Sequence, residues 1–410
     1  MRHPSRRRSA VAVALLVAVI AGMAVAITRA RSNSPEPGPS PSVTATATSS
    51  TTPTATPTSQ AQPTMLLQLR DDYLSAVDNV LIGNQGPQSR TAQIYFPADL
   101  IVDLDKGQSR ILQDTGTQPL ESAGTQVSAQ SGAQVNGTFV MDRLAFAGLV
   151  DAVGGVTLDI KKPVVAKDGF GNVVAIVPLG TRTLDGPSAA VYAMYLSPGA
   201  PETERIARFQ QVWLKVLAQL PPQPERVRAI LGSLGALARS TQPVEVVAQF
   251  LAEAGTNVRG KAVVNAVAPT SPGAVGPLPA SWIRRIEMAD QVAKLLPWAA
   301  IAVDAPRPRV AVHQSGADPV AAQAAKGTLD SQGFAFVWSG PAAVDGALVA
   351  VADPGLTELG GRVAAALGLP TTAVTVAPAR TPGTPVTVYF PAPSDLPAES
   401  PPVAVTSSTP

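Results

Sequence analysis

The pattern of hydrophobic and polar positions divides most of the chain into two folded blocks. In the first, residues 65–297, short apolar runs of strand length alternate with stretches whose apolar positions recur every three to four residues. In the second, residues 307–390, short strands are interleaved with two amphipathic helices. This order predicts a mixed α/β domain followed by a small α/β sandwich of ferredoxin-like type.

The clearest single element is an amphipathic helix predicted over residues 202–220. Its core-facing positions follow the helical repeat and are Ile206, Phe209, Trp213, Val216, Leu217 and Leu220. Arg205 and Arg208 lie off this stripe, which favours a solvated basic face paired with neighbouring glutamates. Arginines one turn apart also suit a phosphate, because the guanidinium fork matches its oxygens.

The remaining elements follow from periodicity and from Gly or Pro stop signals. Further helices are predicted over 143–153, 226–239, 244–254, 282–296, 319–332 and 356–367, and residues 122–132 are interpreted as a loop or a weak helix. Strands are predicted at 65–69, 77–82, 93–96, 100–104, 156–160, 164–165, 173–177, 263–267, 309–313, 335–338, 347–352, 373–376 and 386–390. The Asp-Gly segment at 168–172 is typical of a hairpin turn.

An uncharged apolar segment occupies residues 9–28. A helix of this length spans about 30 Å, which is the thickness of a bilayer core. Four arginines precede it and two follow, so the positive-inside rule places residues 1–8 in the cytoplasm and the bulk outside the cell membrane. We therefore predict a single-pass transmembrane signal anchor. A signal peptide cleaved near Ala24-Val25-Ala26 and a buried helix of a soluble domain are the alternatives.

Three segments lack the pattern of a folded domain. Residues 29–64 and 391–410 are rich in Pro, Ser, Thr and Ala and cannot bury enough apolar surface to offset the entropy of ordering. They predict a disordered stalk and a disordered tail. Residues 298–306 are interpreted as a linker between the two blocks.

The amino-acid composition excludes several kinds of catalytic and binding site. The 410 residues include no cysteine and two histidines, His3 and His313, which excludes disulfides, thiolate nucleophiles and Cys-based metal sites. His313 is interpreted as a packed or surface residue, and Asp103 and Asp105 as solvated strand-end carboxylates. Beyond the six arginines of the first 31 residues, 25 basic residues face 29 acidic ones, a net charge of −4. Nucleic-acid binding is therefore not expected.

Three segments in a fixed order resemble the LytR–CpsA–Psr domain of cell-wall assembly proteins. They are LVDAVGGVTLDI at 149–160, VPLGTRTLDGPSAAVY at 177–192 and RIARFQQ at 205–211. The resemblance implies an α/β domain with a hydrophobic channel for a polyprenyl chain. It also implies transfer of a glycopolymer from a polyprenyl-pyrophosphate carrier to peptidoglycan, with Mg²⁺ helping to hold the pyrophosphate. The second block resembles the LytR C-terminal domain that often follows the first.

The resemblance also shows where this sequence departs from the family's catalytic pattern. It places the metal-binding Asp-Thr on Pro63-Thr64, the Arg of Pro-Arg-Asp on Ala98, and two further arginines on Met194 and Leu196. The remaining candidates for pyrophosphate binding are Arg205, Arg208, Gln210 and Asp99. Because losing one charge-stabilising donor commonly costs about 10²–10³ in rate, we expect the fold to be kept and the chemistry to be lost.

Three functions remain open. The first is a membrane-anchored, extracytoplasmic pseudoenzyme of cell-wall biogenesis that binds a polyprenyl phosphate lipid, a wall glycopolymer or peptidoglycan, with no metal or other cofactor. The second is a working phosphotransferase that attaches glycopolymers with Mg²⁺ and an altered site. The third is a structural protein-interaction module whose lipid channel has closed.

Overall fold

A computed structural model describes residues 64–391, except 86–89, 168–172, 198, 317–318 and 378–383. The predicted anchor, the stalk up to residue 63, the turn at 168–172 and the tail from residue 392 lie outside the described residues. Within the described ranges, no helix is both long and apolar enough to cross a bilayer.

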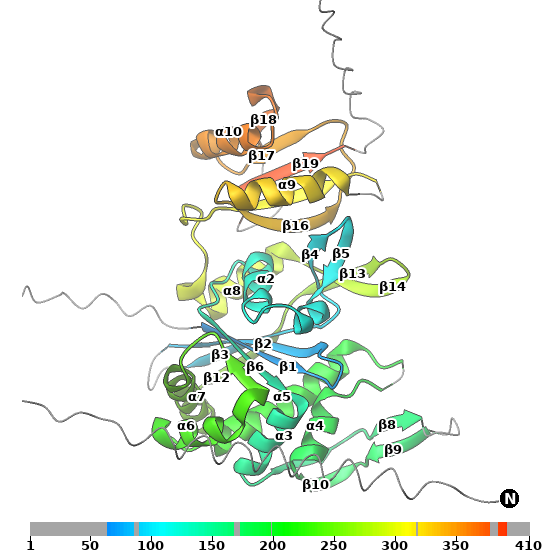
Figure 1. Ribbon diagram of the computed structural model, residues 1–410, viewed down its shortest axis with the longest axis vertical. Coiled ribbons are helices and arrows are strands. Elements are labelled where there is room, and N and C mark those ends of the chain that lie inside the picture. Colours follow the sequence, from blue (N-terminus) through cyan, green and yellow to red (C-terminus); the bar gives the residue numbers. More distant parts are fainter. Residues whose placement is uncertain are drawn as a thin grey trace, which may run out of the picture. The chain divides into compact units, whose positions relative to one another are not determined.

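The first block is built on a six-stranded mixed sheet of order β11-β6-β1-β2-β3-β12 (Figure 1). Its strands are β1 (Thr64–Arg70), β2 (Ala76–Asn84), β3 (Thr91–Phe96), β6 (Gly137–Asp142), β11 (Ala238–Ser240) and β12 (Val263–Val267). β1 pairs antiparallel with β2 and parallel with β6, so it lies inside the sheet. Every residue of β1, β2 and β3 is buried, which explains their nearly continuous apolar runs.

Helices cover both faces of this sheet (Figure 1). One face carries α3 (Arg143–Ala152), α4 (Gly186–Met194), α5 (Glu202–Gln219), α6 (Pro224–Ser233) and α7 (Val244–Arg259), and the other carries α2 (Ser122–Ser131) and α8 (Arg285–Leu295). Successive strand residues point to opposite faces. Leu67 and Leu69 accordingly join the core beside α3–α7, whereas Leu66 joins the core beside α2 and α8.

Four antiparallel two-stranded ribbons extend from this framework. They pair β4 (Ile101–Asp105) with β5 (Gln108–Ile111), β7 (Val156–Ile160) with β10 (Gly180–Leu184), β8 (Val164–Lys167) with β9 (Val173–Val177), and β13 (Thr270–Val275) with β14 (Leu278–Ile283).

Several predicted bounds in the first block are wrong. The helix predicted over 226–239 ends at Ser233, and Ala238–Ser240 instead pairs with β6. The helix predicted from residue 282 begins at Arg285, because the residues before it form β14. The weakly patterned segment 122–132 is a full helix, α2, because packing against the sheet outweighs its modest helix propensity. Leu144 on α3 is 57% exposed, although it is apolar.

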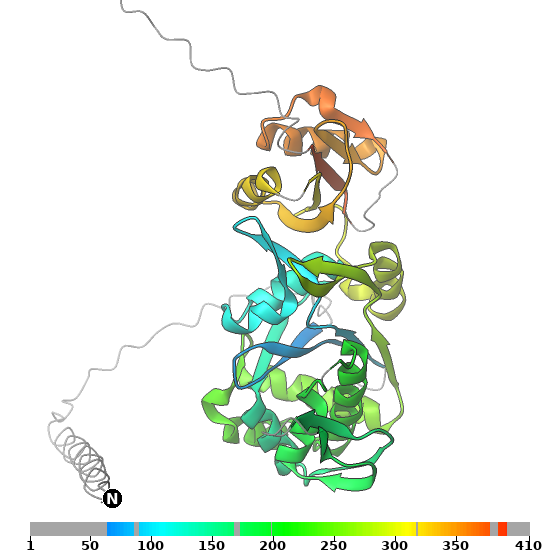
Figure 2. The same cartoon turned by 90° about the vertical axis from the view of Figure 1, so that its right-hand side faces the viewer.

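The second block is a five-stranded sheet of order β16-β15-β19-β17-β18 with two helices (Figure 2). Its elements are β15 (Arg309–Gln314), α9 (Val320–Ser331), β16 (Ala335–Pro341), β17 (Leu348–Val351), α10 (Thr357–Ala366), β18 (Val374–Val376) and β19 (Val386–Phe390). Each predicted element is present, but the ferredoxin-like topology is wrong. β15 and β16 pair in parallel, as do β17 and β18, so each βαβ unit joins neighbouring strands rather than a split pair.

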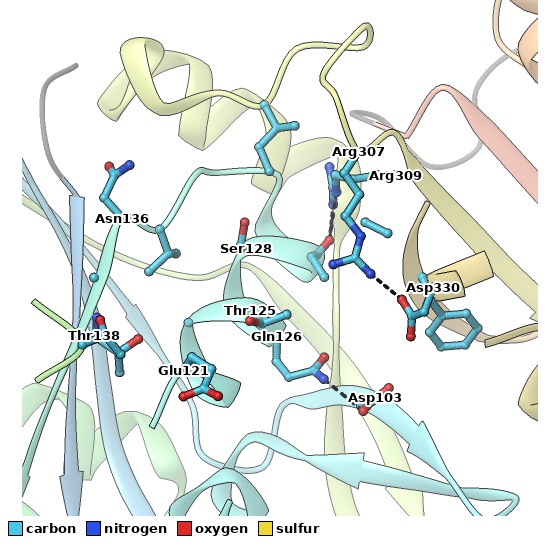
Figure 3. A pocket seen from close by; sticks show the side chains of 18 of the residues that line it. Asp103, Glu121, Thr125, Gln126, Ser128, Asn136, Thr138, Arg307, Arg309 and Asp330 are labelled. Carbon is cyan, nitrogen blue, oxygen red and sulfur yellow. Dashed lines mark hydrogen bonds and ion pairs between the residues drawn. The ribbon is translucent and has the colours of Figure 1, made fainter. Parts of the chain in front are cut away.

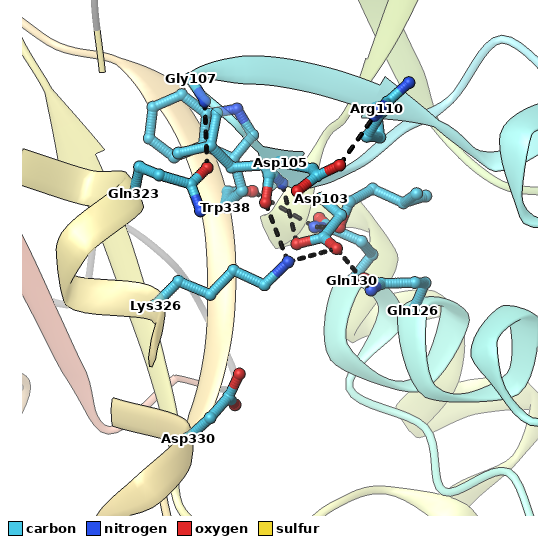
Figure 4. A network of polar contacts seen from close by, with 12 residues as sticks. Asp103, Asp105, Gly107, Arg110, Gln126, Gln130, Gln323, Lys326, Asp330 and Trp338 are labelled. Atoms are coloured by element: carbon cyan, nitrogen blue, oxygen red, sulfur yellow. Dashed lines mark hydrogen bonds and ion pairs between the residues drawn. The ribbon is translucent and has the colours of Figure 1, made fainter. Parts of the chain in front are cut away.

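The two blocks share a buried core and a polar contact. Ile101, Leu104 and Ala280 of the first block lie in one hydrophobic cluster with apolar residues of the second. Lys326 on α9 donates to Asp103 Oδ2 at 2.6 Å and to the Leu104 carbonyl oxygen at 2.8 Å (Figure 4). The prediction that Asp103 is solvated is therefore wrong, because the packing of the second block encloses it.

Candidate functional site

Arg205 and Arg208 lie one turn apart on α5 and are buried, with 4% and 8% of their surface exposed. The prediction of a solvated basic face is therefore wrong. α5 packs in the core that covers one face of the central sheet, and it also packs against α4. The positions next to its apolar stripe are therefore buried as well.

The guanidinium group of Arg205 is held by neighbouring protein groups. Its Nη2 donates to the Val77 carbonyl oxygen at 2.6 Å and to a carboxylate oxygen of Glu202. Its Nε lies 3.6 Å from Oδ1 of Asp78, which is also buried. Arg205 therefore ties the start of α5 to β2.

Arg208 is engaged in the same way by the end of α4. Its Nε donates to the Tyr192 carbonyl oxygen at 2.7 Å, and its Nη2 donates to the Tyr195 carbonyl oxygen. The guanidinium carbon also lies 5.9 Å from the centre of the Tyr192 ring. A positive charge is favourable here, because the last carbonyl groups of a helix carry partial negative charge.

Three carboxyl groups surround Arg205: Asp78 on β2, Asp99 after β3, and Glu202 at the start of α5. Burial raises the pKa of Asp78 to about 7, with Arg205 opposing the shift. Burial likewise raises the pKa values of Asp99 and Glu202. Asp99 Oδ2 accepts a hydrogen bond of 3.0 Å from the Ser281 hydroxyl. The structure thus brings Arg205, Arg208 and the partly buried Asp99 into one charge cluster, with Asp99 next to Ala98, whose backbone N–H donates to Glu202 at 3.3 Å.

Sequence reasoning missed Asp78 and undervalued Glu202. Asp78 interrupts an apolar run of strand length, and an acidic residue in a fully buried strand is a signal of a paired or functional group. Gln210, the fourth predicted residue, is half-buried on α5, and no hydrogen bond joins it to the cluster among the described residues.

Arg205 also borders a pocket of about 480 Å³. The wall of this Arg205 pocket is largely apolar and includes Val77, Ala190, Val191, Met194 and Leu196. At its rim Arg143 Nε pairs with Asp72 at 2.8 Å, and Tyr73 is 86% exposed. Met194 and Leu196, where the resemblance expects arginines, contribute apolar surface instead.

The interior between the sheet and α5 is filled by aromatic side chains. Phe209 packs against Tyr95, Phe146 and Trp213, with ring centroids 5.8, 6.2 and 6.4 Å apart. All four side chains are fully buried. This interior is a packed core, so the apolar part of a ligand would find room in the Arg205 pocket instead.

The cluster does not provide a metal centre of its own. Mg²⁺ takes oxygen ligands in near-octahedral geometry. Within the described part of the chain, no group of three or more acidic or histidine side chains could hold a metal ion. Asp78 lies beside the Arg205 guanidinium in a closed environment rather than facing an open cavity. The donor set does not fit Mg²⁺, and no catalytic step through a metal follows from it.

The raised pKa of Asp78 predicts a pH-dependent stability. Because the pKa lies at about 7 in the folded protein and near 3.8 when unfolded, the folded state holds a proton that the unfolded state releases. The stabilisation that protonated Asp78 gives the folded state is therefore fully present below the pKa of the unfolded state. It is lost as pH rises through the pKa of the folded state. Asp99 and Glu202 act in the same direction.

We expect the full-length protein to unfold at lower urea concentration at about pH 8 than at about pH 5. Asp78→Asn should reduce this difference, whereas Asp105→Asn, at a half-exposed residue that pairs with Arg110, should leave it unchanged. Equal pH dependence in both variants would contradict the assignment to Asp78.

Residues 78–274 match the sequence model of the LytR_cpsA_psr family. Pro63-Thr64, where the resemblance placed the Asp-Thr motif, lies outside this range, whereas Asp78 is its first residue. No curated protein matches the chain.

Similar solved structures include TagV of B. subtilis, with 14% identity, 57% of this chain and 97% of that chain covered, and a TM-score of 0.47. The LytR-Csp2A-Psr enzyme from Actinomyces oris has 17% identity, covers 58% of this chain and 90% of its own, and has a TM-score of 0.46. A structure of TagT bound to LIIa-WTA is 15% identical, with 58% of this chain and 91% of the TagT chain covered and a TM-score of 0.47.

Proposed function

Because residues 78–274 form a domain of the LytR–CpsA–Psr family, we propose that this protein acts in cell-wall glycopolymer processing as a non-catalytic binder. Its ligand is a polyprenyl-linked wall component that enters the Arg205 pocket. The apolar segment at residues 9–28 and the arginines that precede it support an anchor in the membrane, with both folded blocks on its outer side.

The observation that carries the proposal is the commitment of both arginines to protein groups. Transfer from a pyrophosphate carrier requires preorganised donors that stabilise charge on the leaving phosphate. Here Arg205 donates a hydrogen bond to the Val77 carbonyl oxygen and pairs with Glu202 and Asp78. Arg208 donates hydrogen bonds to two carbonyl oxygens. The cluster contains three carboxyl groups and two guanidinium groups, so it offers a pyrophosphate no excess of positive charge.

The apolar wall of the pocket supports binding of a hydrocarbon chain. The pocket volume of about 480 Å³ lies within the usual range of small-molecule sites, roughly 300–1,000 Å³. Burial of apolar ligand surface against Val191, Met194 and Leu196 would stabilise the complex without any charge on the headgroup.

Native mass spectrometry of the full-length protein in mild detergent tests this function, with undecaprenyl phosphate added as the probe. We expect a bound lipid in the wild type. Leu196→Asp should abolish binding by placing a charge in the apolar wall, whereas Leu237→Asp, at an exposed leucine outside the pocket, should retain it. Absence of bound lipid in the wild type would overturn the proposal.

A working transferase is the second candidate, favoured by one observation. Among the described residues, neither of the buried carboxylate oxygens of Asp78 has a hydrogen-bond partner. Strongly perturbed acids of this kind concentrate at functional sites. Turnover of a polyprenyl-pyrophosphate-linked glycopolymer that Asp78→Asn abolishes would establish this candidate and overturn the non-catalytic proposal.

A further inference from the structure

A second pocket, of about 530 Å³, lies between the two blocks on the α2 side of the central sheet, away from Arg205 (Figure 3). One wall is formed by α2 and the start of β6. The other is formed by β15, α9 and β16 of the second block. We call it the interblock pocket.

Seven neutral polar side chains line the interblock pocket. They are Thr125, Gln126, Ser128, Asn136, Thr138, Thr241 and Gln242. Hydroxyl and amide groups can both donate and accept hydrogen bonds, which is the pattern required by a ligand rich in hydroxyl groups. Among the described residues of this lining, Phe336 is the one aromatic side chain, and Val135 and Ile301 are the large aliphatic ones.

The charged groups of the pocket balance one another. Arg307 Nη2 pairs with Asp330 Oδ1 at 2.6 Å within the second block (Figure 3). Lys326 Nζ pairs with Asp103 Oδ2 at 2.6 Å. The remaining charged lining residues are Arg309 and Glu121, so three cations face three carboxylates. This balance favours an uncharged ligand over a phosphate or a polyanion.

Three side chains, two on α2 and one at its N-cap residue Glu121, are available to a ligand. Glu121, Thr125 and Ser128 follow the i, i+4, i+7 spacing and therefore lie on one side of the helix. None of the three side chains forms a hydrogen bond or ion pair with another described residue, although all three line the pocket (Figure 3). A carboxylate accepts strong hydrogen bonds from hydroxyl groups, and the two hydroxyls can accept or donate.

The neighbouring residues hold this arrangement in place. Asp103 accepts hydrogen bonds from Gln126 Nε2 at 2.9 Å and from Lys326 Nζ, which connects α2 to α9 through β4 (Figure 4). Both walls are therefore fixed relative to each other before a ligand enters. Such preorganisation reduces the entropic cost of binding.

We propose that the interblock pocket binds an uncharged saccharide unit of a wall glycan, with Glu121, Thr125 and Ser128 bonding its hydroxyl groups. The identity of the sugar as a wall glycan rests on the proposed function, whereas the class of ligand rests on the pocket lining. The protein would then hold a lipid-linked component on one side of the sheet and a glycan on the other.

Isothermal titration calorimetry of the full-length protein in mild detergent, with the neutral tetrasaccharide of N-acetylglucosamine as the probe, tests this inference. We expect saturable binding to the wild type. Thr125→Val combined with Ser128→Ala should weaken it at least about tenfold, the loss expected from removing two hydrogen bonds. Thr203→Val, at an exposed helical threonine on α5 outside the pocket, should bind as the wild type does.

Two outcomes would overturn the saccharide site: no binding to the folded wild type, or unchanged affinity in the double variant. Leu196→Asp separates this inference from the proposed function, since it should abolish lipid binding and leave the affinity for the tetrasaccharide unchanged. Sugar binding without lipid binding in the wild type would contradict the lipid proposal while supporting this site.

Discussion

Replacing Arg205 with Ala will lower the free energy of unfolding by about 3–5 kcal/mol, the usual cost of breaking a buried ion pair from one side. The substitution leaves Asp78 and Glu202 enclosed without their cation and removes the donor to the Val77 carbonyl oxygen. Urea unfolding of the full-length protein, followed by tryptophan fluorescence, measures the loss.

Arg143→Ala provides the matched control for this prediction. Arg143 pairs with Asp72 near the same pocket, but its side chain is 33% exposed and that of Asp72 is 60% exposed. Such a surface pair contributes about 0–1 kcal/mol. If Arg205→Ala cost no more than this control, Arg205 would be free to bind a ligand anion and the argument against catalysis would fail.

Neutralising the partners should recover part of the lost stability. In the Arg205→Met, Asp78→Asn, Glu202→Gln triple variant, the cation and the two carboxyl groups that it contacts are all neutral. We expect it to be more stable than Arg205→Met alone, because well-packed neutral groups often replace a buried ion pair at little cost. A triple variant that is less stable than the single variant would show that hydrogen bonds rather than charge hold the cluster.

Phe209→Ala will lower the free energy of unfolding by about 3–5 kcal/mol, as large-to-small changes in a packed core do. Phe209 is the shared contact of Tyr95, Phe146 and Trp213, and none of these rings can reach solvent. The change removes the dispersion contacts of one ring and leaves a cavity between α5 and the sheet. Urea unfolding of the full-length protein measures this loss as well.

The same variant tests whether the interior is a core or a lipid channel. Phe209→Leu should cost clearly less than Phe209→Ala, because it retains most of the volume. A loss below about 1 kcal/mol for Phe209→Ala, or full recovery of stability on adding undecaprenyl phosphate, would mean that this interior accommodates a lipid chain and is not a closed core.

The helix α5 illustrates which structural features a local sequence pattern can predict and which it cannot. Its bounds and its apolar stripe follow from a repeat of 3.6 residues, which any amphipathic helix must show if one side faces a core. The burial of Arg205 and Arg208 does not follow from that repeat, because β2 contacts Arg205 and α4 contacts Arg208 at positions that an isolated helix would expose to water. Asp78 likewise becomes a site residue only through contact with a helix more than a hundred positions later.

Sequence alone predicted a mixed α/β fold, most of its strands and helices, and three members of the charge cluster, but it missed β5, β6, β10, β11, β13, β14 and α4. These features depend on local periodicity, turn residues and residue chemistry, which are encoded within short windows. Tertiary structure alone decided the unsplit βαβ topology of the second block, the pairing of Ala238–Ser240 as a strand, the bridge between Asp103 and Lys326, and the interblock pocket. Each of these depends on which distant surfaces pack together, and no local pattern carries that information.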